Sequence, residues 1–201
     1  MPVAIRLATE HDAEGIAAIY APIVRNTAIS FEFEPPSVDD MRQRIGSIMQ
    51  QLPWLVCDHD NEVLGYAYAG KHRERAAYQW SVDVSVYVHQ RARRTGVGRA
   101  LYTSLFAVLV LQGYCNVYAG ATLPNAGSVA LHESLGFERV GVYRSVGYKM
   151  GAWHDVVWWQ RPLQPRSPTP QPPIGIDAAQ HLPTWRAAIE AGLPLLRLDV
   201  H

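Results

Sequence analysis

The sequence contains few of the features that distinguish secreted and membrane proteins. Its 201 residues include two cysteines, Cys57 and Cys115, and each lies in a short apolar run. Two such cysteines do not make a disulfide framework and favour buried free thiols in a reducing compartment. The longest apolar run, Leu105 to Leu111, is far too short to cross a bilayer. The N-terminal stretch MPVAIRLATEHD contains no uninterrupted apolar run, so we expect no signal peptide and a cytoplasmic location.

An excess of charge of one sign is also absent. Eighteen lysines and arginines balance 18 aspartates and glutamates, so the overall charge gives no reason to expect nucleic acid or an anionic membrane as a partner. The eight histidines include no pair four residues apart and have no cysteine at ligand spacing, so we expect no metal site. Apolar side chains are abundant: 48% of the residues are hydrophobic, enough for one sizeable core.

Alternating apolar residues and helix caps predict a mixed sheet. Thr9 with Asp12, and Ser37 with Asp40, have the spacing of capping boxes that open helices. Gly113 is expected to close the helix that follows residue 98. The expected order is strand 3–7, two helices, a three-stranded meander (54–58, 63–70 and 78–88), a helix, strand 115–121, helix 128–135, and a final hairpin that ends in 153–160. This order predicts an α/β (α+β) fold, a mixed central sheet flanked by helices.

The composition changes after residue 161. Half of the positions from Pro162 to Pro173 are proline, which predicts a stiff, extended segment on the surface. Within residues 174–201, the pattern predicts one or two helical turns over Thr184 to Ala191. A segment this short cannot bury a core alone, so we expect it to pack against the domain or a partner subunit. We therefore divide the chain into a domain (1–161), a Pro-rich linker (162–173) and a C-terminal appendage (174–201).

The most informative stretch is Ser85 to Leu101, where a strand enters a basic, glycine-containing turn and then a helix. Apolar residues at every second position from 82 to 88 predict a strand with one buried face. The turn from Arg93 to Gly98 combines residues without bulk, backbone N–H groups at a helix start, and guanidinium groups. This combination predicts a phosphate-bearing ligand. The alternatives are that the glycines only shape a tight turn and that the arginines form a solvated face.

Two motifs carry a resemblance to a known family. Arg93, Gly96 and Gly98 match the Arg/Gln-x-x-Gly-x-Gly/Ala signature of the GNAT superfamily of acyl-CoA-dependent N-acetyltransferases. A downstream segment, Asn-x-x-Ser-x-x-x-aromatic-x-x-x-Gly-Phe in the superfamily, is matched by Asn125, Ser128, His132, Gly136 and Phe137. Within the superfamily the chain is most similar to phosphinothricin N-acetyltransferases and to the enzymes that act on methionine sulfoximine and sulfone, over roughly residues 3–161.

The resemblance implies a function and a cofactor. It implies transfer of an acetyl group from acetyl-CoA to the primary amine of a small amino acid or analogue, by direct attack on the thioester. Two alternatives remain open: acetylation of a protein N-terminus or a lysine, and a non-catalytic acyl-CoA-binding module. Relatives of this type are commonly homodimers, so we expect a homodimer with the hairpin Tyr148 to His154 or the appendage near the interface.

The resemblance also assigns residues to the cofactor. The pantetheine arm is expected to bond to the backbone of Val86, Tyr87 and Val88, as if it were another strand. Asn125 and Ser128 are expected to help fix the pantetheine and adenosine portions. The pyrophosphate is expected at the positive end of the helix that follows the turn, near Arg93, Arg94, Thr95, Gly96, Val97, Gly98 and Arg99.

Two residues are candidates for proton transfer. Asp83 lies where phosphinothricin-type enzymes commonly have Glu, and the side chain is shorter by roughly an ångström, which implies that it acts on the amine through a water. The alternative is a strand carboxylate that only orients the ammonium group. His132 stands where many relatives have a tyrosine that protonates the departing thiolate, which a histidine can do near neutral pH. The alternative is a buried histidine that packs and hydrogen-bonds.

Four residues are candidates for holding the amine substrate. Arg73 and Arg75 lie in a basic loop just before the strand that carries Asp83, and a guanidinium there is suited to binding a carboxylate through two hydrogen bonds. Phe31 and Tyr78 are expected to wall the pocket. The alternatives are solvated loop charges and ordinary core aromatics.

Overall fold

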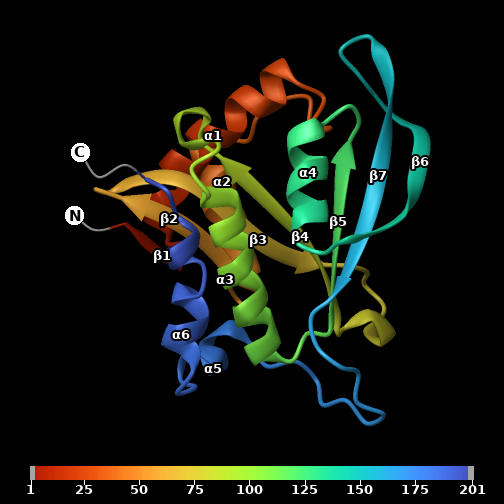
Figure 1. Ribbon diagram of the computed structural model, residues 1–201. Coiled ribbons are helices and arrows are strands. Elements are labelled where there is room, and N and C mark those ends of the chain that lie inside the picture. The colour runs from red at the N-terminus through yellow and green to blue at the C-terminus, as the bar shows by residue number, and fades with distance from the viewer. Residues whose placement is uncertain (1–2, 199–201) are drawn as a thin grey trace.

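A seven-stranded sheet runs through the protein, in the order β1-β2-β3-β4-β5-β7-β6 (Figure 1). The computed structural model describes residues 3–198; the first two residues of the predicted domain and the last three of the predicted appendage lie outside that range. The strands are β1 (Ala4–Leu7), β2 (Trp54–His59), β3 (Glu62–Lys71), β4 (Ser81–Val88), β5 (Asn116–Thr122), β6 (Glu138–Lys149) and β7 (Ala152–Pro162). The helices are α1 (Ala13–Asn26), α2 (Val38–Ile48), α3 (Val97–Gln112), α4 (Ala126–Ser134), α5 (Ile176–Gln180) and α6 (Trp185–Glu190), with short 3-10 helices η1 (Glu10–Asp12), η2 (Ala76–Tyr78), η3 (Gln90–Ala92) and η4 (Leu193–Leu195).

The predicted mixed fold is confirmed, and its element order matches up to the end of β7. Both capping boxes are present: Asp40 N–H donates to Ser37 Oγ at 3.1 Å, and Thr9 N–H donates to Asp12 Oδ2 at 2.7 Å. Gly113 ends α3 with φ +96°, in the left-handed region that glycine favours. One boundary was wrong: the strand expected from Tyr78 begins at Ser81, because residues 76–78 form η2.

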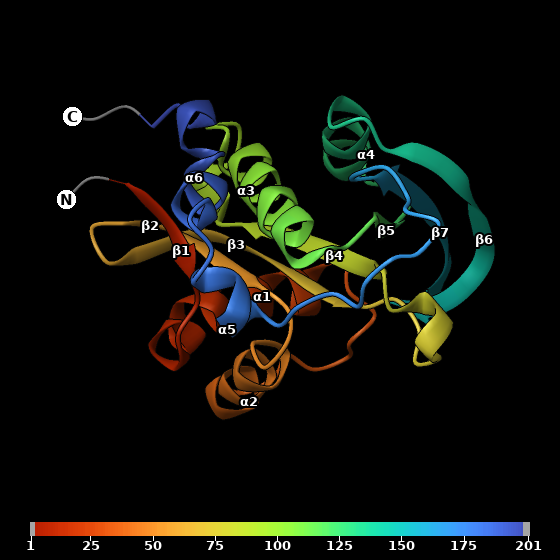
Figure 2. The ribbon, with the colours of Figure 1, turned by 90° about the horizontal axis from the view of Figure 1, so that it is seen from below.

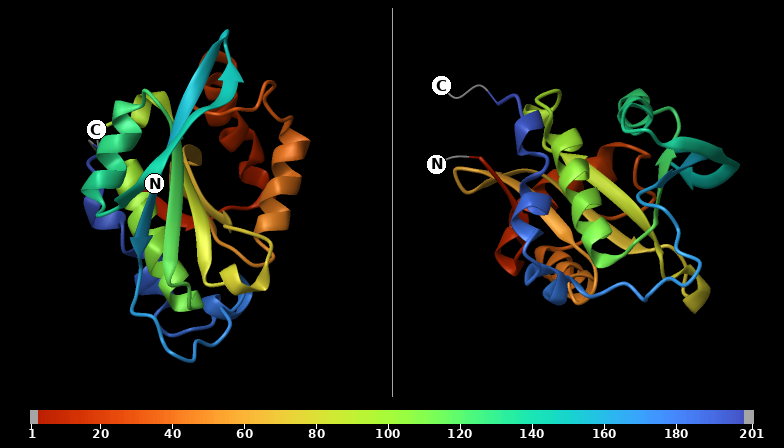
Figure 3. Two further views of the ribbon diagram at one scale, coloured as in Figure 1. Left: turned by 90° about the vertical axis from the view of Figure 1, so that its right-hand side faces the viewer. Right: turned by 60° about the horizontal axis from the view of Figure 1, so that its bottom comes forward.

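Helices cover both faces of the sheet and bury two apolar clusters (Figures 2 and 3). On one face α1 and α2 pack on Trp54, Val56 and Tyr66. On the other face α3 packs on alternate residues of the central strands, Val82 and Val84 among them. Among the described residues, no helix is long and apolar enough to span a membrane.

One pair of neighbouring strands separates in the middle of the sheet. The strands β4 and β5 are parallel, and their pairing covers only Ser81 with Asn116, Val82 with Val117 and Asp83 with Tyr118. Beyond Asp83 both strands continue without a ladder between them, and they diverge visibly (Figure 1). The other edge of β4 stays paired with β3 as far as Val88. The C-terminal parts of β4 and β5 therefore border an opening in the sheet.

The segment after β7 returns to the helix that follows the basic turn. The Pro-rich linker is largely exposed, and α5 and α6 then lie along α3 (Figures 1 and 2). Ile176, Ala188 and Ile189 are buried in the same cluster as α3. The helix α5 was not anticipated from the sequence, since so short a helix gives too little apolar periodicity to recognise.

A glycine allows this close packing. Gly192 N–H donates to Ser104 Oγ at 3.0 Å, and a Cβ added at Gly192 would lie 1.9 Å from the backbone oxygen of Ala100. The Gly192 φ of −84° is accessible to any residue. The requirement for glycine here is therefore steric and not conformational.

We expect Gly192→Ala to lower the free energy of unfolding by about 1–3 kcal/mol, because the added methyl must push η4 away from α3. Urea denaturation measures this change. The matched control is Gly141→Ala, since nothing lies within 4 Å of a Cβ built at Gly141. Equal stability of the two variants would show that η4 does not pack closely on α3.

Candidate active site

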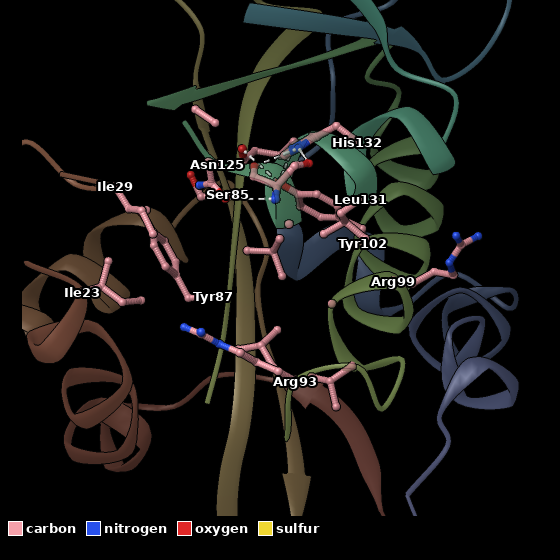
Figure 4. Close-up of a pocket in the computed structure, with 18 of the residues that line it drawn as sticks. Ile23, Ile29, Ser85, Tyr87, Arg93, Arg99, Tyr102, Asn125, Leu131 and His132 are labelled. Atoms are coloured by element: carbon pink, nitrogen blue, oxygen red, sulfur yellow. Dashed lines mark hydrogen bonds between the residues drawn. The ribbon is translucent and has the colours of Figure 1, made fainter. Parts of the chain in front are cut away.

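A cavity of about 650 Å³ lies at the opening between β4 and β5 (Figure 4). Its walls come from β4, the basic turn, the start of α3, β5 and α4, and from Ile23 of α1 and Ile29 on the opposite face of the sheet. All but one of the residues predicted to bind the cofactor line it, together with His132: Val86, Tyr87, Val88, Arg93, Arg94, Gly96, Val97, Gly98, Arg99, Asn125 and Ser128.

Thr95 is the exception, because its side chain bonds within the turn. Its hydroxyl donates to the carbonyl of Ala92 at 2.7 Å, a bond within the turn itself. Thr95 is absent from the cavity wall. The side chain therefore supports the turn from behind, and no contact in the structure supports a direct role in binding the cofactor.

The basic turn presents backbone donors to the cavity. Arg94 and Gly96 have φ of +65° and +87°, and this left-handed geometry turns the chain directly into α3. The first helical bond of α3 runs from Ala100 N–H to the Gly96 carbonyl at 2.9 Å. The N–H groups of residues 97–99 precede that bond and so have no helical acceptor. Together with the helix dipole they form an anion-binding site.

His132 is buried and surrounded by aromatic rings. It is 4% exposed, and its ring stacks on Trp159 with centroids 5.0 Å apart. His132 Nδ1 lies 2.7 Å from the carbonyl of Ser128, a contact that requires the proton on Nδ1. Burial lowers the pKa of His132, so the ring is neutral at pH 7. These contacts favour the packing alternative for His132 over direct protonation of a thiolate.

Tyr102 is a residue of the cavity wall that the sequence did not reveal. Its hydroxyl lies 3.3 Å from His132 Nε2 and donates to the carbonyl of Val84 at 3.3 Å. The tyrosine is 1% exposed, and burial raises its pKa well above the ordinary value. The unprotonated His132 Nε2 and the Val84 carbonyl are therefore two acceptors for the one proton of the Tyr102 hydroxyl, which lies beside β4. The sequence offers no local signal for this role, because Tyr102 falls on the apolar face of α3.

Asp83 lies where β4 and β5 begin to separate, outside the cavity wall. Its neighbours Val82 and Val84 face α3, so its side chain is on the opposite face of the sheet. Asp83 Oδ1 is 2.7 Å from His72 Nδ1, and the His72 ring stacks on Tyr118 with centroids 4.2 Å apart. Burial raises the pKa of Asp83, and the hydrogen bond to His72 opposes that rise.

His72, which precedes Arg73 in the basic loop, was not singled out from the sequence. A usable signal exists: β3 and β4 are antiparallel, with Gly70 opposite Asp83 and Lys71 opposite Val82. His72, one residue past the ladder and on the same face as Gly70, is therefore a diagonal neighbour of Asp83. Register cannot be read reliably from one sequence, but a histidine that ends one strand of a predicted hairpin, with an acidic residue near the start of the next, is a recognisable pattern.

The four candidate substrate residues occupy two places. Arg73 and Tyr78 lie near the His72–Asp83 pair: Arg73 Nη1 donates to the His72 carbonyl at 2.7 Å, and the rings of Tyr78 and His72 are 6.0 Å apart. Arg75 is exposed at the start of η2. Phe31 packs under the β6–β7 hairpin, where a Cβ added at Gly147 would lie 2.2 Å from its ring.

No cluster of three or more His, Cys, Asp or Glu residues that could hold a metal occurs in residues 3–198. The arrangement instead combines an anion-binding turn, an open strand edge and a half-buried His–Asp pair. Such a set can hold a phosphorylated, extended ligand along the open edge and accept a proton where the strands separate.

Known proteins resemble this chain in sequence and in fold. Residues 5–158 match the model of the acetyltransferase (GNAT) domain. The chain is 39% identical over 174 residues to a phosphinothricin N-acetyltransferase of Streptomyces viridochromogenes, covering 86% of this chain and 95% of that one. It is 35% identical over 172 residues to an L-methionine sulfoximine/L-methionine sulfone acetyltransferase of Pseudomonas aeruginosa, covering 85% and 100%.

A solved structure has a similar fold. A GNAT superfamily phosphinothricin acetyltransferase from Sinorhizobium meliloti, crystallised in complex with AcCoA, is 35% identical and superposes with a TM-score of 0.79 over 86% of this chain and 94% of that one. The family match over residues 5–158 spans the diverging strands, the basic turn and the helix α4. The chain therefore belongs to the GNAT superfamily and is an acetyl-CoA-dependent N-acetyltransferase, as its sequence predicted.

Proposed function

We propose that the protein acetylates the α-amine of a small amino acid or an analogue, of the phosphinothricin or methionine sulfoximine type. The observation that carries the proposal is the His72–Asp83 pair, which lies at 2.7 Å where β4 and β5 separate. It stands on the face of the sheet opposite α3, and the cavity reaches that face at Ile23 and Tyr87, so the proton acceptor and the acyl donor share the opening between β4 and β5. The relatives that match most of the chain act on small molecules of this type according to their names.

The donors of the cavity fit acetyl-CoA. The open edge of β4 beyond Asp83 offers unpaired backbone groups of Val86 and Val88 to an extended amide-containing arm. The N–H groups of residues 97–99, Arg93 and Arg99 suit a pyrophosphate. Asn125 Oδ1 accepts the Ser128 N–H at 3.1 Å, which starts α4 at the cavity wall. When bound, acetyl-CoA supplies the thioester that the amine attacks.

We assign the proton acceptor to His72, positioned by Asp83. When His72 Nδ1–H donates to the carboxylate, Nε2 is left as the acceptor for the proton that the amine loses. An imidazole is a better base near neutral pH than a carboxylate. The histidine thus takes the place of the water that the shorter Asp83 side chain led us to expect. Asp83 orients His72 through the contact of 2.7 Å between Oδ1 and Nδ1.

Two further tasks remain: the departing sulfur needs a hydrogen-bond donor, and the amine substrate needs a binding site. The amine nitrogen bonds to the carbonyl carbon, the carbon–sulfur bond breaks, and the sulfur leaves with the bonding electrons. The Tyr102 hydroxyl lies 3.3 Å from both the Val84 carbonyl and His132 Nε2, and we propose that it turns its one proton from that carbonyl to the departing sulfur. Arg73 and Arg75 are proposed to bind the substrate carboxylate and Tyr78, beside His72, to flank its side chain. Phe31 lies under the β6–β7 hairpin, and its part in substrate binding stays a prediction.

We also propose a cytoplasmic location. Cys57 and Cys115 are both buried and unpaired, which suits a reducing compartment.

The substrate assignment predicts thiol release from acetyl-CoA with L-phosphinothricin, L-methionine sulfoximine or L-methionine sulfone as acceptor. A colourimetric thiol assay with a panel of these amines measures it, with peptides carrying a free N-terminus or an internal lysine in parallel wells. Saturable turnover only with the peptides would replace the small-molecule proposal with the protein-acetylating alternative. Absence of turnover with every acceptor, together with tight CoA binding, would favour the non-catalytic alternative.

The base assignment predicts that His72→Gln and Asp83→Asn each lower kcat by about 100-fold or more, with CoA affinity unchanged. Steady-state kinetics and CoA titration measure the two quantities. His181→Gln and Asp177→Asn, both exposed on the appendage, are the matched controls. Retention of activity in His72→Gln with loss in Asp83→Asn would identify Asp83 as the direct base.

The same pair predicts a fall in kcat/KM as pH decreases. Protonation of either partner removes the acceptor, and burial raises the pKa of Asp83, so its contribution is lost at a higher pH than for an exposed aspartate. The other groups near the pair are Arg73, whose charge lowers the Asp83 pKa, and the hydroxyls of Tyr78 and Tyr118. A pH–rate profile that is flat down to pH 5 would contradict the assignment.

We propose that the protein is a homodimer that buries the tip of the β6–β7 hairpin. Five large apolar residues there are at least half exposed: Tyr143, Val146, Tyr148, Met150 and Trp153. A patch of this kind marks a protein contact site, and the family expectation places the partner copy there.

Sedimentation velocity is expected to give a dimer for the wild type and a monomer for Trp153→Glu, because a carboxylate cannot be desolvated in an apolar contact. Val38→Glu, at the exposed first position of α2, is the control that should remain dimeric. A monomeric wild type would refute the proposal.

A further inference from the structure

The end of the appendage contacts the basic turn directly. Arg197 N–H donates to the carbonyl of Thr95 at 2.7 Å. A Cβ added at Gly96 would lie 2.1 Å from the carbonyl oxygen of Leu195. Gly96 has φ +87° as well, so both its conformation and its contact with η4 require glycine. Residues 195–197 are therefore packed on the basic turn itself, although they lie outside the family domain at residues 5–158.

Three arginines surround a second cavity at this contact. The cavity has a volume of about 470 Å³ and is lined by Arg94, Gly96, Arg99, Pro194, Leu195 and Arg197. No acidic residue is among these described lining residues. Arg94, Gly96 and Arg99 also line the larger cavity between β4 and β5, so the two cavities adjoin across the turn. The appendage contributes the third guanidinium.

The three arginines have no carboxylate partner among the described residues. Within the described chain, no ion pair or side-chain hydrogen bond is formed by Arg94, Arg99 or Arg197, whereas six other arginines are paired with carboxylates: Arg6, Arg42, Arg44, Arg91, Arg144 and Arg186. Three like charges around one hollow repel one another, and an anion of high charge density relieves that repulsion. The charge around the second cavity therefore suits a phosphate.

We propose that Arg197, with Arg94 and Arg99, binds the 3′-phosphate at the nucleotide end of CoA, so that the appendage forms part of the cofactor site. The inference rests on acetyl-CoA as the acyl donor. The N–H groups of residues 97–99 face the larger cavity and serve the pyrophosphate. The second cavity lies on the other side of the same arginines, where the remaining phosphate of the nucleotide, a monoester with up to two charges, meets three guanidinium groups.

The test compares CoA with 3′-dephospho-CoA by isothermal titration calorimetry of the full-length protein. We expect Arg197→Ala to weaken CoA binding by about tenfold and to leave the affinity for 3′-dephospho-CoA unchanged. Arg197→Lys should restore part of the difference, because it keeps the charge but not the forked geometry. The difference should shrink as salt is raised, since the site is exposed.

Arg186→Ala is the matched control, an exposed arginine of α6 that pairs with Glu190. Its affinity for both ligands should equal that of the wild type. Equal weakening of both ligands by Arg197→Ala would overturn the assignment to the 3′-phosphate, and unchanged affinity for both would overturn any role of Arg197 in the site. If the wild type bound neither ligand, the acyl-donor assignment itself would fail, an outcome distinct from the other two.

Discussion

The parallel pairing of β4 and β5 ends at Asp83 and Tyr118, and the positions of all the functional groups depend on this interruption. Two central strands that separate leave backbone N–H and C=O groups inside the protein without strand partners, which is costly unless other groups bond to them. Here one carbonyl, that of Val84, accepts from Tyr102 at 3.3 Å. The remaining groups line a cavity of about 650 Å³. The sheet therefore keeps one strand edge open for a ligand that can bond to it as a strand would.

The second requirement is an anion site at the far end of that open edge. The chain achieves it with a left-handed turn at Arg94 and Gly96, which starts α3 with its first N–H groups directed at the cavity. Leu195 and Arg197 pack against the outer side of the same turn. Gly96 thus serves two functions, and substitution at this position combines backbone strain with displacement of η4. The appendage is part of the architecture of the turn, although the two segments are far apart in the sequence.

Local patterns predicted the fold well and the site only in part. Some signals depend only on neighbouring residues and can be recognised in one sequence. They are the capping boxes, the period of two in β4, and the glycines of the turn. The η2 turn at residues 76–78, the short α5, and the contact between Arg197 and the turn depend on packing between distant segments. The His72–Asp83 pair falls between these cases, since it needs only the register of one hairpin. Register is set by the hydrophobic pattern of both strands together with the connecting loop, and this loop is long and irregular.

The alternation of side chains along β4 separates the apolar packing on α3 from the face that carries the proton acceptor. Val82 and Val84 face α3, whereas Asp83 and Tyr87 face the side of α1 and α2, where Tyr87 stacks on Tyr66 with centroids 5.2 Å apart. A slip of one residue in the pairing with β3 would exchange the two faces. It would place a carboxylate in the apolar cluster under α3 and remove the partner of His72. The apolar core that stabilises β4 therefore also determines on which side of the sheet a proton can be accepted.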